Sequence, residues 1–169
     1  AADNMGPLWL TAAPLPLGTA HTVCILMALS SHSFAQLPLK PQLLSNLETL
    51  DYLRMTPIQK ESLPLILEGS DVIGQGKTGS GKTAAFGLGL LNKLDVKYFR
   101  VQCLILCPTR ELADQVAKEV RRLARAIHNI KVLTICGGAP LGPQIGSLEH
   151  GAHIVVGTPG RIEDHVNKG

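Results

Sequence analysis

Residues 74–87 read GQGKTGSGKTAAFG, and the fold depends on which of two phosphate-binding patterns in this stretch is real. The pattern G-x-G-x-x-G, which begins at Gly74, is typical of dinucleotide-binding folds but is weak when it stands alone. Such folds also place an acidic residue about 20 residues further on, at the end of the next strand. Asp95 has that spacing, yet it precedes the next apolar run, residues 101–107, and would lie at the wrong end of that strand.

The second pattern, G-x-x-x-x-G-K-[ST], is the P-loop, and it ends at Lys82 and Thr83. A chance match in a chain of this length has a probability under about one per cent. The glycines let backbone N–H groups surround a phosphate, Lys82 places a cation on the terminal phosphates, and Thr83 offers its hydroxyl to Mg²⁺. The dinucleotide pattern gives Lys82 and Thr83 no role, so the sequence favours a nucleoside triphosphate. The candidate nucleotide-binding residues of the loop are Lys77, Thr78, Gly79, Ser80, Gly81, Lys82, Thr83 and Ala84.

Composition limits the class of protein. With 169 residues, 45% of them hydrophobic, the chain has room for one domain with a core and not for two. A net charge of +3 permits a polyanionic partner without requiring one. The four cysteines follow no metal-ligand spacing and indicate reduced thiols in a cytoplasmic protein, which we expect to be a monomer. Residues 1–33 lack Lys and Arg and are broken by prolines, which predicts a poorly ordered extension and neither a secretory signal nor a membrane span.

Beyond this extension, short apolar runs alternate with helical periodicity, which predicts a parallel sheet covered by helices. Thr56 and Thr158 each precede a proline and are predicted helix caps. The predicted strands are DVIGQ (71–75), VQCLILC (101–107), KVLTIC (131–136) and HIVVG (153–157). The clearest helix, residues 110–127, carries an apolar stripe of Leu112, Val116, Val120, Leu123 and Ile127. Its opposite face is basic and is expected to face solvent; it consists of Lys118, Arg121, Arg122 and Arg125.

Ligands of open parallel sheets bind beyond the carboxyl ends of the strands. Here these ends carry PTRELA (108–113), a Gly-Gly pair (137–138) and TPGR (158–161). Each segment alone is an ordinary helix cap or tight turn. Together they combine helix N-termini, close-approach glycines and two arginines on one edge, which predicts several anion sites and a long polyanionic ligand.

Two features concern the base of the nucleotide. NKLD (92–95) matches the guanine-recognition motif of GTPases, but it ends the helix that the P-loop begins instead of following a later strand, which indicates coincidence. The Gln59 amide points to adenine, because such a group can donate to N7 and accept from the N6 amino group at once. Taken by itself, one glutamine is weak support.

In order and spacing, these segments resemble the first RecA-like domain of DEAD-box RNA helicases: Phe34, YLRMTPIQ (52–59), GKTGSGKT (76–83), PTRELA, the Gly-Gly pair and TPGR. The resemblance runs over residues 34–169 and implies a RecA-like α/β fold that binds ATP and Mg²⁺. It implies that Gln59 and Thr56 position adenine and that Phe34 stacks on it. It also implies single-stranded RNA held by its backbone, with ribosomal RNA of the large subunit as the target. The implied RNA-binding residues are Pro108, Thr109, Arg110, Gly138, Thr158, Gly160 and Arg161.

The sequence also departs from the family pattern. Asp51 stands where the family usually has Gly, and Gly76 and Gly157 stand where it often has Ala. More seriously, no apolar run ending in Asp-Glu-Ala-Asp follows, and the family needs those carboxylates and arginines of a second domain for hydrolysis. We therefore expect a partial domain, truncated before the Walker B strand, that holds no catalytic residues, binds ATP weakly and hydrolyses none, with open sheet edges that favour aggregation. A non-catalytic RNA- or partner-binding module and a P-loop NTPase of another kind, such as a small-molecule kinase, remain as alternatives.

Overall fold

The structure is a computed structural model that describes residues 32–168. The predicted extension over residues 1–33 lies outside this part except for its last two residues. The helices are η1 (Phe34–Gln36, a 3-10 turn), α2 (Pro41–Thr49), α3 (Pro57–Glu68), α4 (Lys82–Lys93), α5 (Arg110–Leu123), α6 (Leu141–Glu149) and α7 (Pro159–Val166). The strands are β1 (Cys103–Leu106), β2 (Val132–Ile135) and β3 (Ile154–Gly157). Within this part, no helix has the length and apolar character needed to cross a membrane.

The strands form a parallel three-stranded sheet in the order β1-β3-β2. Strand β3 is buried along its whole length, as expected of a central parallel strand that is covered on both faces. Its last residue, Gly157, lies opposite Leu106 of β1 and Ile135 of β2, so all three strands end at the same edge. Three of the four predicted strands are thereby confirmed, and so is the parallel α/β architecture.

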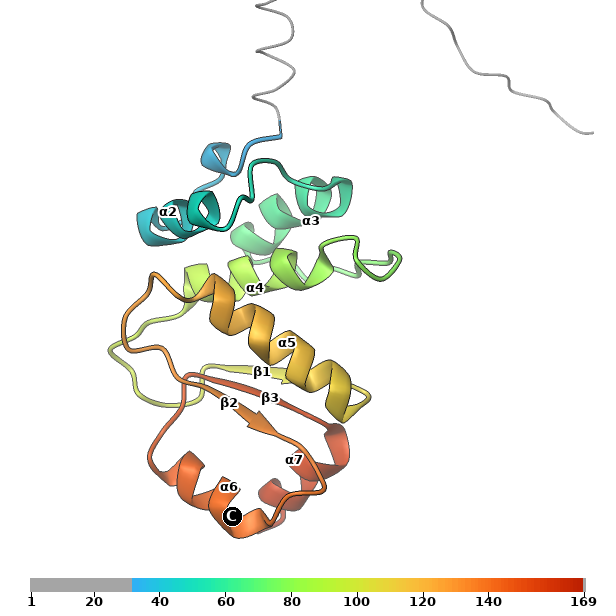
Figure 1. The fold of residues 1–169 in the computed structure, drawn as a ribbon, viewed down its shortest axis with the longest axis vertical. Helices are drawn as coiled ribbons and strands as arrows, with labels where there is room; N and C mark the ends of the chain where they lie inside the picture. The colour runs from blue at the N-terminus through green and yellow to red at the C-terminus, as the bar shows by residue number, and fades with distance from the viewer. Residues whose placement is uncertain (1–31, 169) are drawn as a thin grey trace, which may run out of the picture. The chain divides into compact units, whose positions relative to one another are not determined.

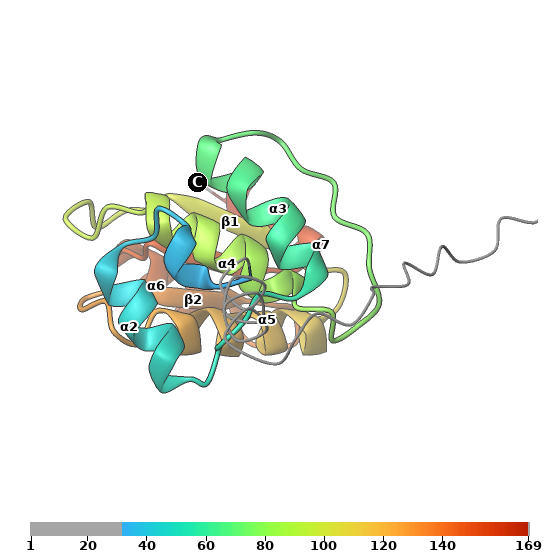
Figure 2. The same cartoon turned by 90° about the horizontal axis from the view of Figure 1, so that it is seen from above.

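The helices cover the two faces of the sheet. Helix α5 packs on one face, and α6 and α7 lie on the other (Figure 1). Helix α4 lies between α3 and α5 and buries Leu88 and Leu91, which are 0% exposed (Figure 2). The layers thus place the start of α4, the start of α5 and the end of β3 on neighbouring parts of the molecule.

Helix α5 follows its sequence pattern with two differences. The Thr109 hydroxyl accepts from the Leu112 N–H (3.2 Å) and caps the helix, which ends at Leu123 and not at the predicted Ile127. Leu112 is exposed, so the predicted apolar stripe is wrong at that position; the buried face consists of Ala113, Val116, Ala117, Val120 and Leu123. The four basic residues are exposed as expected. Among them, Arg121 donates to the Val132 carbonyl (2.9 Å) and to the Thr134 hydroxyl (3.0 Å) of strand β2.

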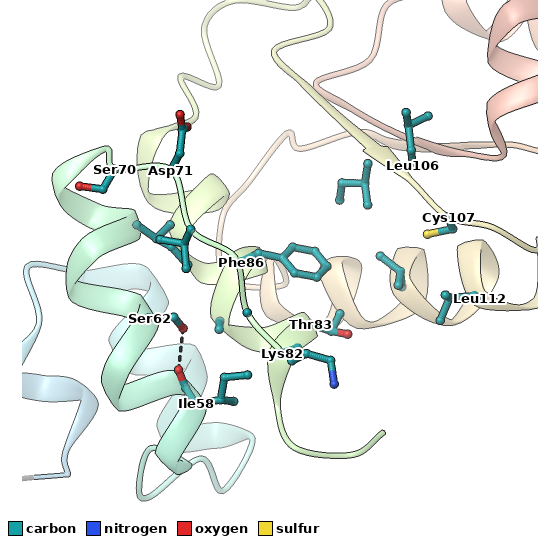
Figure 3. Close-up of a pocket in the computed structure, with 16 residues that line it drawn as sticks. Ile58, Ser62, Ser70, Asp71, Lys82, Thr83, Phe86, Leu106, Cys107 and Leu112 are labelled. Carbon is teal, nitrogen blue, oxygen red and sulfur yellow. Dashed lines mark hydrogen bonds between the residues drawn. The ribbon is translucent and has the colours of Figure 1, made fainter. Parts of the chain in front are cut away.

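The predicted strand DVIGQ (71–75) is not part of the sheet. In this segment Val72 is half-buried and Ile73 is fully exposed, and no strand within residues 32–168 pairs with it. A cavity of about 520 Å³ with a largely apolar lining separates the segment from β1, and Figure 3 shows Phe86 of α4 between Asp71 and Leu106. An extended segment becomes a strand only when a neighbour supplies hydrogen bonds, and this cavity keeps β1 out of reach.

A buried histidine fastens the start of β3 to two neighbouring segments. His153 is 0% exposed, its Nδ1 accepts from the Lys131 N–H (3.1 Å), and its Nε2–H donates to the Val96 carbonyl (3.2 Å). The rings of Phe99 and His153 pack in a T-shaped arrangement, with ring centroids 4.8 Å apart. These contacts hold the segments before β1 and β2 against the start of β3.

Candidate functional site

The glycine-rich loop has the backbone that its sequence predicts. It ends at Gly81, where α4 begins with Lys82, so Lys82 and Thr83 are the first two residues of a twelve-residue helix. Gly79 and Gly81 have φ angles of 81° and 91°, a left-handed conformation that glycine adopts without strain. The free N–H groups and the dipole at such a helix start favour an anion.

The Lys82 side chain lies inside the loop. Its ammonium donates to the carbonyls of Gly76 and Lys77, the latter at 2.7 Å, and to the Ser80 hydroxyl at 3.3 Å. All three partners belong to the loop itself. Phosphate oxygens are acceptors of the same kind and stronger, so the ammonium has the position and the chemistry to exchange these bonds for a bound phosphate.

Gln59 and Thr56 connect the loop to α3. The Gln59 side chain is 1% exposed; its Nε2 donates to the Gly81 carbonyl (3.1 Å) and its Oε1 accepts from the Thr56 N–H (2.8 Å). The Thr56 hydroxyl donates to the Ser80 carbonyl (2.8 Å). Both residues therefore lie at the loop, as predicted, but their hydrogen bonds go to backbone groups of the loop and of the α3 cap. Reading of adenine by these two side chains stays a prediction.

Both the contact with Gln59 and Thr56 and the positive φ angle require glycine at position 81. A Cβ atom at residue 81 would lie 2.5 Å from Nε2 of Gln59 and 2.9 Å from Oγ1 of Thr56. Gly79 has the same handedness, but a Cβ there would meet nothing within 4 Å. Of these two loop glycines, Gly81 is the one at which the close approach of Gln59 and Thr56 excludes a side chain.

A cavity of about 610 Å³ lies between the loop and α5. Tyr52 is the one aromatic residue among those that line it, and sequence reasoning missed this residue. Phe34, which was predicted to stack on adenine, is 3% exposed and packs edge-on behind Tyr52, with ring centroids 6.3 Å apart. The lining residues are Tyr52, Thr78, Gly79, Gly81, Lys82, Thr83, Ala84, Leu112, Gln115, Lys118, Glu119 and Arg122.

The Tyr52 ring is held by two side chains of α5. Its hydroxyl donates to Oε1 of Glu119 (2.6 Å), and the Arg122 guanidinium lies over its ring, 5.5 Å from the centroid. Arg122 and Glu119 form an ion pair at 3.5 Å. Burial, together with the hydrogen bond to the Glu119 carboxylate and its charge, raises the pKa of Tyr52 from 10.0 to about 12.

The guanine-motif interpretation of NKLD finds no support in the geometry. Asn92 lies near the C-terminal end of α4, the helix that begins at the loop, and does not follow a later strand. Its Oδ1 accepts from the Lys40 N–H (2.7 Å) and its Nδ2 donates to the Pro38 carbonyl (3.0 Å). Asn92 therefore anchors the segment before α2.

A second cavity, of about 570 Å³, lies at the edge where β1, β2 and β3 end. It brings together six of the seven predicted RNA-binding residues; Gly160 is not among those that line it. Two carboxylates, Glu111 and Asp164, line the same cavity and reduce its positive charge. The six predicted residues are Pro108, Thr109, Arg110, Gly138, Thr158 and Arg161.

The two arginines of this cavity are held differently. Arg110 lies against the glycine pair: a Cβ at Gly138, where φ is 89°, would overlap its guanidinium. The Arg110 side chain makes no hydrogen bond or ion pair within the part of the chain that the structure describes. Arg161 donates to the Ala139 carbonyl (2.9 Å) and to Oε1 of Gln144 (3.3 Å), and it pairs with Asp164 at 3.4 Å. Arg110 is thus the cation that is most available to an external anion.

Comparison with known proteins agrees with this geometry. The sequence profile described as DEAD/DEAH box helicase matches residues 56–169. The chain is 62% identical over 131 residues to the ATP-dependent RNA helicase DbpA of Escherichia coli, which covers 78% of this chain and 29% of DbpA. It is 44% identical over 137 residues to the DEAD-box ATP-dependent RNA helicase CshA of Geobacillus kaustophilus, with 81% and 29% covered. It therefore spans less than a third of the length of these curated relatives.

Solved structures agree with the sequence relatives. A DEAD box protein from the hyperthermophile Methanococcus jannaschii superposes with a TM-score of 0.76 at 40% identity, over 81% of this chain and 37% of that one. The predicted RecA-like fold class is thereby confirmed for the part of the domain that is present. Together with the profile match, these similarities show that the chain belongs to the DEAD/DEAH box helicase family.

Proposed function

We propose that this chain is the ATP-binding part of an ATP-dependent RNA helicase. The observation that carries the proposal is the presence of a glycine-rich loop, with Lys82 at its centre, together with a second cavity at the ends of the strands that is lined by Arg110 and Arg161. Helix α5 joins the two, because it begins at Arg110 in the second cavity and carries Glu119 and Arg122 in the wall of the first.

The residues of the loop fit the phosphates of ATP. N–H groups at the start of α4 and the Lys82 ammonium would bind them, and the Thr83 hydroxyl would bind Mg²⁺. Within residues 32–168 no group of three or more His, Cys, Asp or Glu side chains is arranged to hold a metal ion. Phosphate oxygens and water would supply further ligands of the magnesium ion.

The nucleoside part of ATP fits the cavity between the loop and α5. This cavity shares Gly81, Lys82 and Thr83 with the phosphate loop, and Tyr52 offers a flat apolar surface in its wall. Gln59 donates to the Gly81 carbonyl and is 1% exposed, so its side chain would have to become accessible to contact adenine. We therefore propose Tyr52 as a base contact in addition to the predicted Gln59, Thr56 and Phe34.

The second cavity would hold single-stranded RNA by its phosphates. Arg110 would bind a phosphate directly, while the N–H groups that follow Thr109 and Thr158 offer further donors. Such contacts position RNA without reading its sequence. Ribosomal RNA of the large subunit as the target, the cytoplasm as the compartment and a monomeric state belong to the proposal on the resemblance alone.

For these 169 residues by themselves we propose ATP binding without hydrolysis, because they contain no Asp-Glu-Ala-Asp motif, whose carboxylates would hold Mg²⁺ and orient water. The test is a phosphate-release assay with ATP, Mg²⁺ and single-stranded RNA. Release no faster than from a Lys82→Ala control supports binding alone. Release above that control shows that the expectation of inactivity is wrong.

ATP binding and RNA binding are tested by two matched variants. We expect Lys82→Ala to abolish ATP binding in calorimetry and to leave RNA binding intact. We expect Arg110→Ala to weaken RNA binding and to lower the slope of log K against log salt by about 1. RNA affinity that ignores both ATP and Lys82→Ala favours a non-catalytic binding module. Equal affinity for GTP and ATP, indifferent to Gln59→Ala, favours a P-loop NTPase of another kind.

A further inference from the structure

One turn of α5 forms a wall of the cavity between the loop and this helix. Glu119 and Arg122 are three residues apart on this helix, and both contact Tyr52, which lies on the segment before α3. The contacts are therefore tertiary, between residues 67 positions apart in the case of Tyr52 and Glu119. Tyr52 packs against the same apolar core to which Val116 and Val120 of α5 belong.

These contacts restrain the Tyr52 ring at three places. The hydroxyl donates to a carboxylate at 2.6 Å, which is the length of a strong, charge-assisted bond. The Arg122 guanidinium lies over the ring, and the ring of Phe34 packs edge-on against it. A tyrosine held at its tip, its face and its edge loses little further conformational entropy when a ligand packs on it.

Glu119 is separate from the contacts that would bind phosphate. The Lys82 ammonium bonds to Gly76, Lys77 and Ser80, and none of these groups contacts Glu119 or Tyr52 by a hydrogen bond. The cavity thus has a phosphate side made by the loop and a nucleoside side made by Tyr52 and α5. A change at Glu119 acts on the second side only.

We propose that Glu119 is a positioning residue for the nucleoside part of ATP: it fixes the Tyr52 ring, with Arg122, in the wall of the cavity between the loop and α5. The inference rests on the proposed function, since it presumes that ATP binds there. It adds a role for two charged residues of α5, a helix whose basic face is otherwise an exposed surface. A change at Glu119 is therefore expected to alter the affinity for ligands that carry a nucleoside and not the affinity for ligands made only of phosphate.

The experiment compares ATP with tripolyphosphate, both as Mg²⁺ complexes, by calorimetry. We expect Glu119→Ala to weaken ATP binding about tenfold, as for the loss of one hydrogen bond to a charged group, and to leave tripolyphosphate binding within about twofold. Glu119→Gln keeps an acceptor for the Tyr52 hydroxyl and is expected to restore most of the ATP affinity. In a Tyr52→Phe background, which lacks that hydroxyl, Glu119→Ala is expected to have little further effect.

Asp114→Ala is the matched control, because Asp114 is an exposed acidic residue of the same helix that lines neither cavity. Equal losses for ATP and tripolyphosphate in Glu119→Ala, or no loss of ATP, overturn the proposal even if Lys82→Ala abolishes binding of both ligands. If wild type binds tripolyphosphate and not ATP, the proposed function fails, and the positioning role fails with it. If Glu119→Ala does not fold, the test uses Glu119→Gln, Tyr52→Phe and the double variant that carries both changes. The ratio of ATP affinity to tripolyphosphate affinity is then compared among these three variants and wild type.

Discussion

Replacing Gly81 by alanine tests whether α3 holds the phosphate loop in place. A Cβ at residue 81 would lie 2.5 Å from Nε2 of Gln59, closer than real Cβ atoms approach nitrogen. Gln59 is 1% exposed and its amide bonds to the Gly81 carbonyl, so we expect the variant to break this bond or to shift the loop. Gly79→Ala introduces the same kind of backbone strain without any such contact.

The two variants differ by a predictable amount. A non-glycine residue in the left-handed conformation costs about 1–2 kcal/mol, and both φ angles, 81° and 91°, lie in that region. For Gly81→Ala, the lost hydrogen bond of a buried amide adds about 1–2 kcal/mol. We therefore expect Gly79→Ala to lower the free energy of unfolding by about 1–2 kcal/mol and Gly81→Ala by about 3 kcal/mol.

The assay is equilibrium unfolding in urea without nucleotide, followed by circular dichroism, with the two variants measured beside wild type. In a Gln59→Ala background, Gly81→Ala is expected to cost less than in wild type, because the side chain that it approaches most closely is gone and only the 2.9 Å approach to Oγ1 of Thr56 remains. Equal destabilisation by the two glycine variants in the wild-type background would falsify the idea that Gln59 and Gly81 hold each other in place.

Three further predictions concern stability and solubility. His153→Ala is expected to lower the free energy of unfolding by about 3 kcal/mol, because it leaves a cavity and two unpaired backbone groups. His150→Ala, at the exposed end of α6, is the control and should change this free energy by under about 1 kcal/mol. Thermal melts of the two variants and wild type measure the difference. The folded pKa of Tyr52, about 12, lies above its ordinary 10.0, so the stability that this group contributes is present below pH 10 and is lost as pH rises toward 12. Urea midpoints of wild type and Tyr52→Phe should therefore converge over that interval, and a constant difference contradicts the cause assigned to the shift. Leu104→Lys with Leu106→Lys should slow aggregation in light scattering with little change in melting temperature, because both side chains are about half exposed, at 49% and 53%.

Local pattern was enough to predict most of the fold. The runs KVLTIC and HIVVG became β2 and β3, and Thr56 and Thr158 each precede a helix that starts with proline. The grouping of the predicted RNA-binding residues in one cavity also followed from chain order, because the carboxyl ends of parallel strands meet at one edge.

What the sequence did not predict depends on tertiary contacts. DVIGQ has the composition of a strand, but pairing depends on a neighbour that no local pattern reveals. Phe34 and Tyr52 are both aromatic and both precede α3, and only packing shows that Tyr52 lines the cavity while Phe34 lies behind it. The contact of Arg121 with β2 likewise joins segments that carry no shared signal in the sequence.

Strand β1 has consequences for the exchange of amide hydrogens with solvent. In a parallel pair, alternate residues of an edge strand direct their backbone groups to the neighbour and away from it. The N–H groups of Cys103 and Cys107 bond to β3-side carbonyls, those of His153 and Gly157, so those of Leu104 and Leu106 point to the open edge. Deuterium uptake along β1 should therefore alternate residue by residue, slow at the two cysteines and fast at the two leucines.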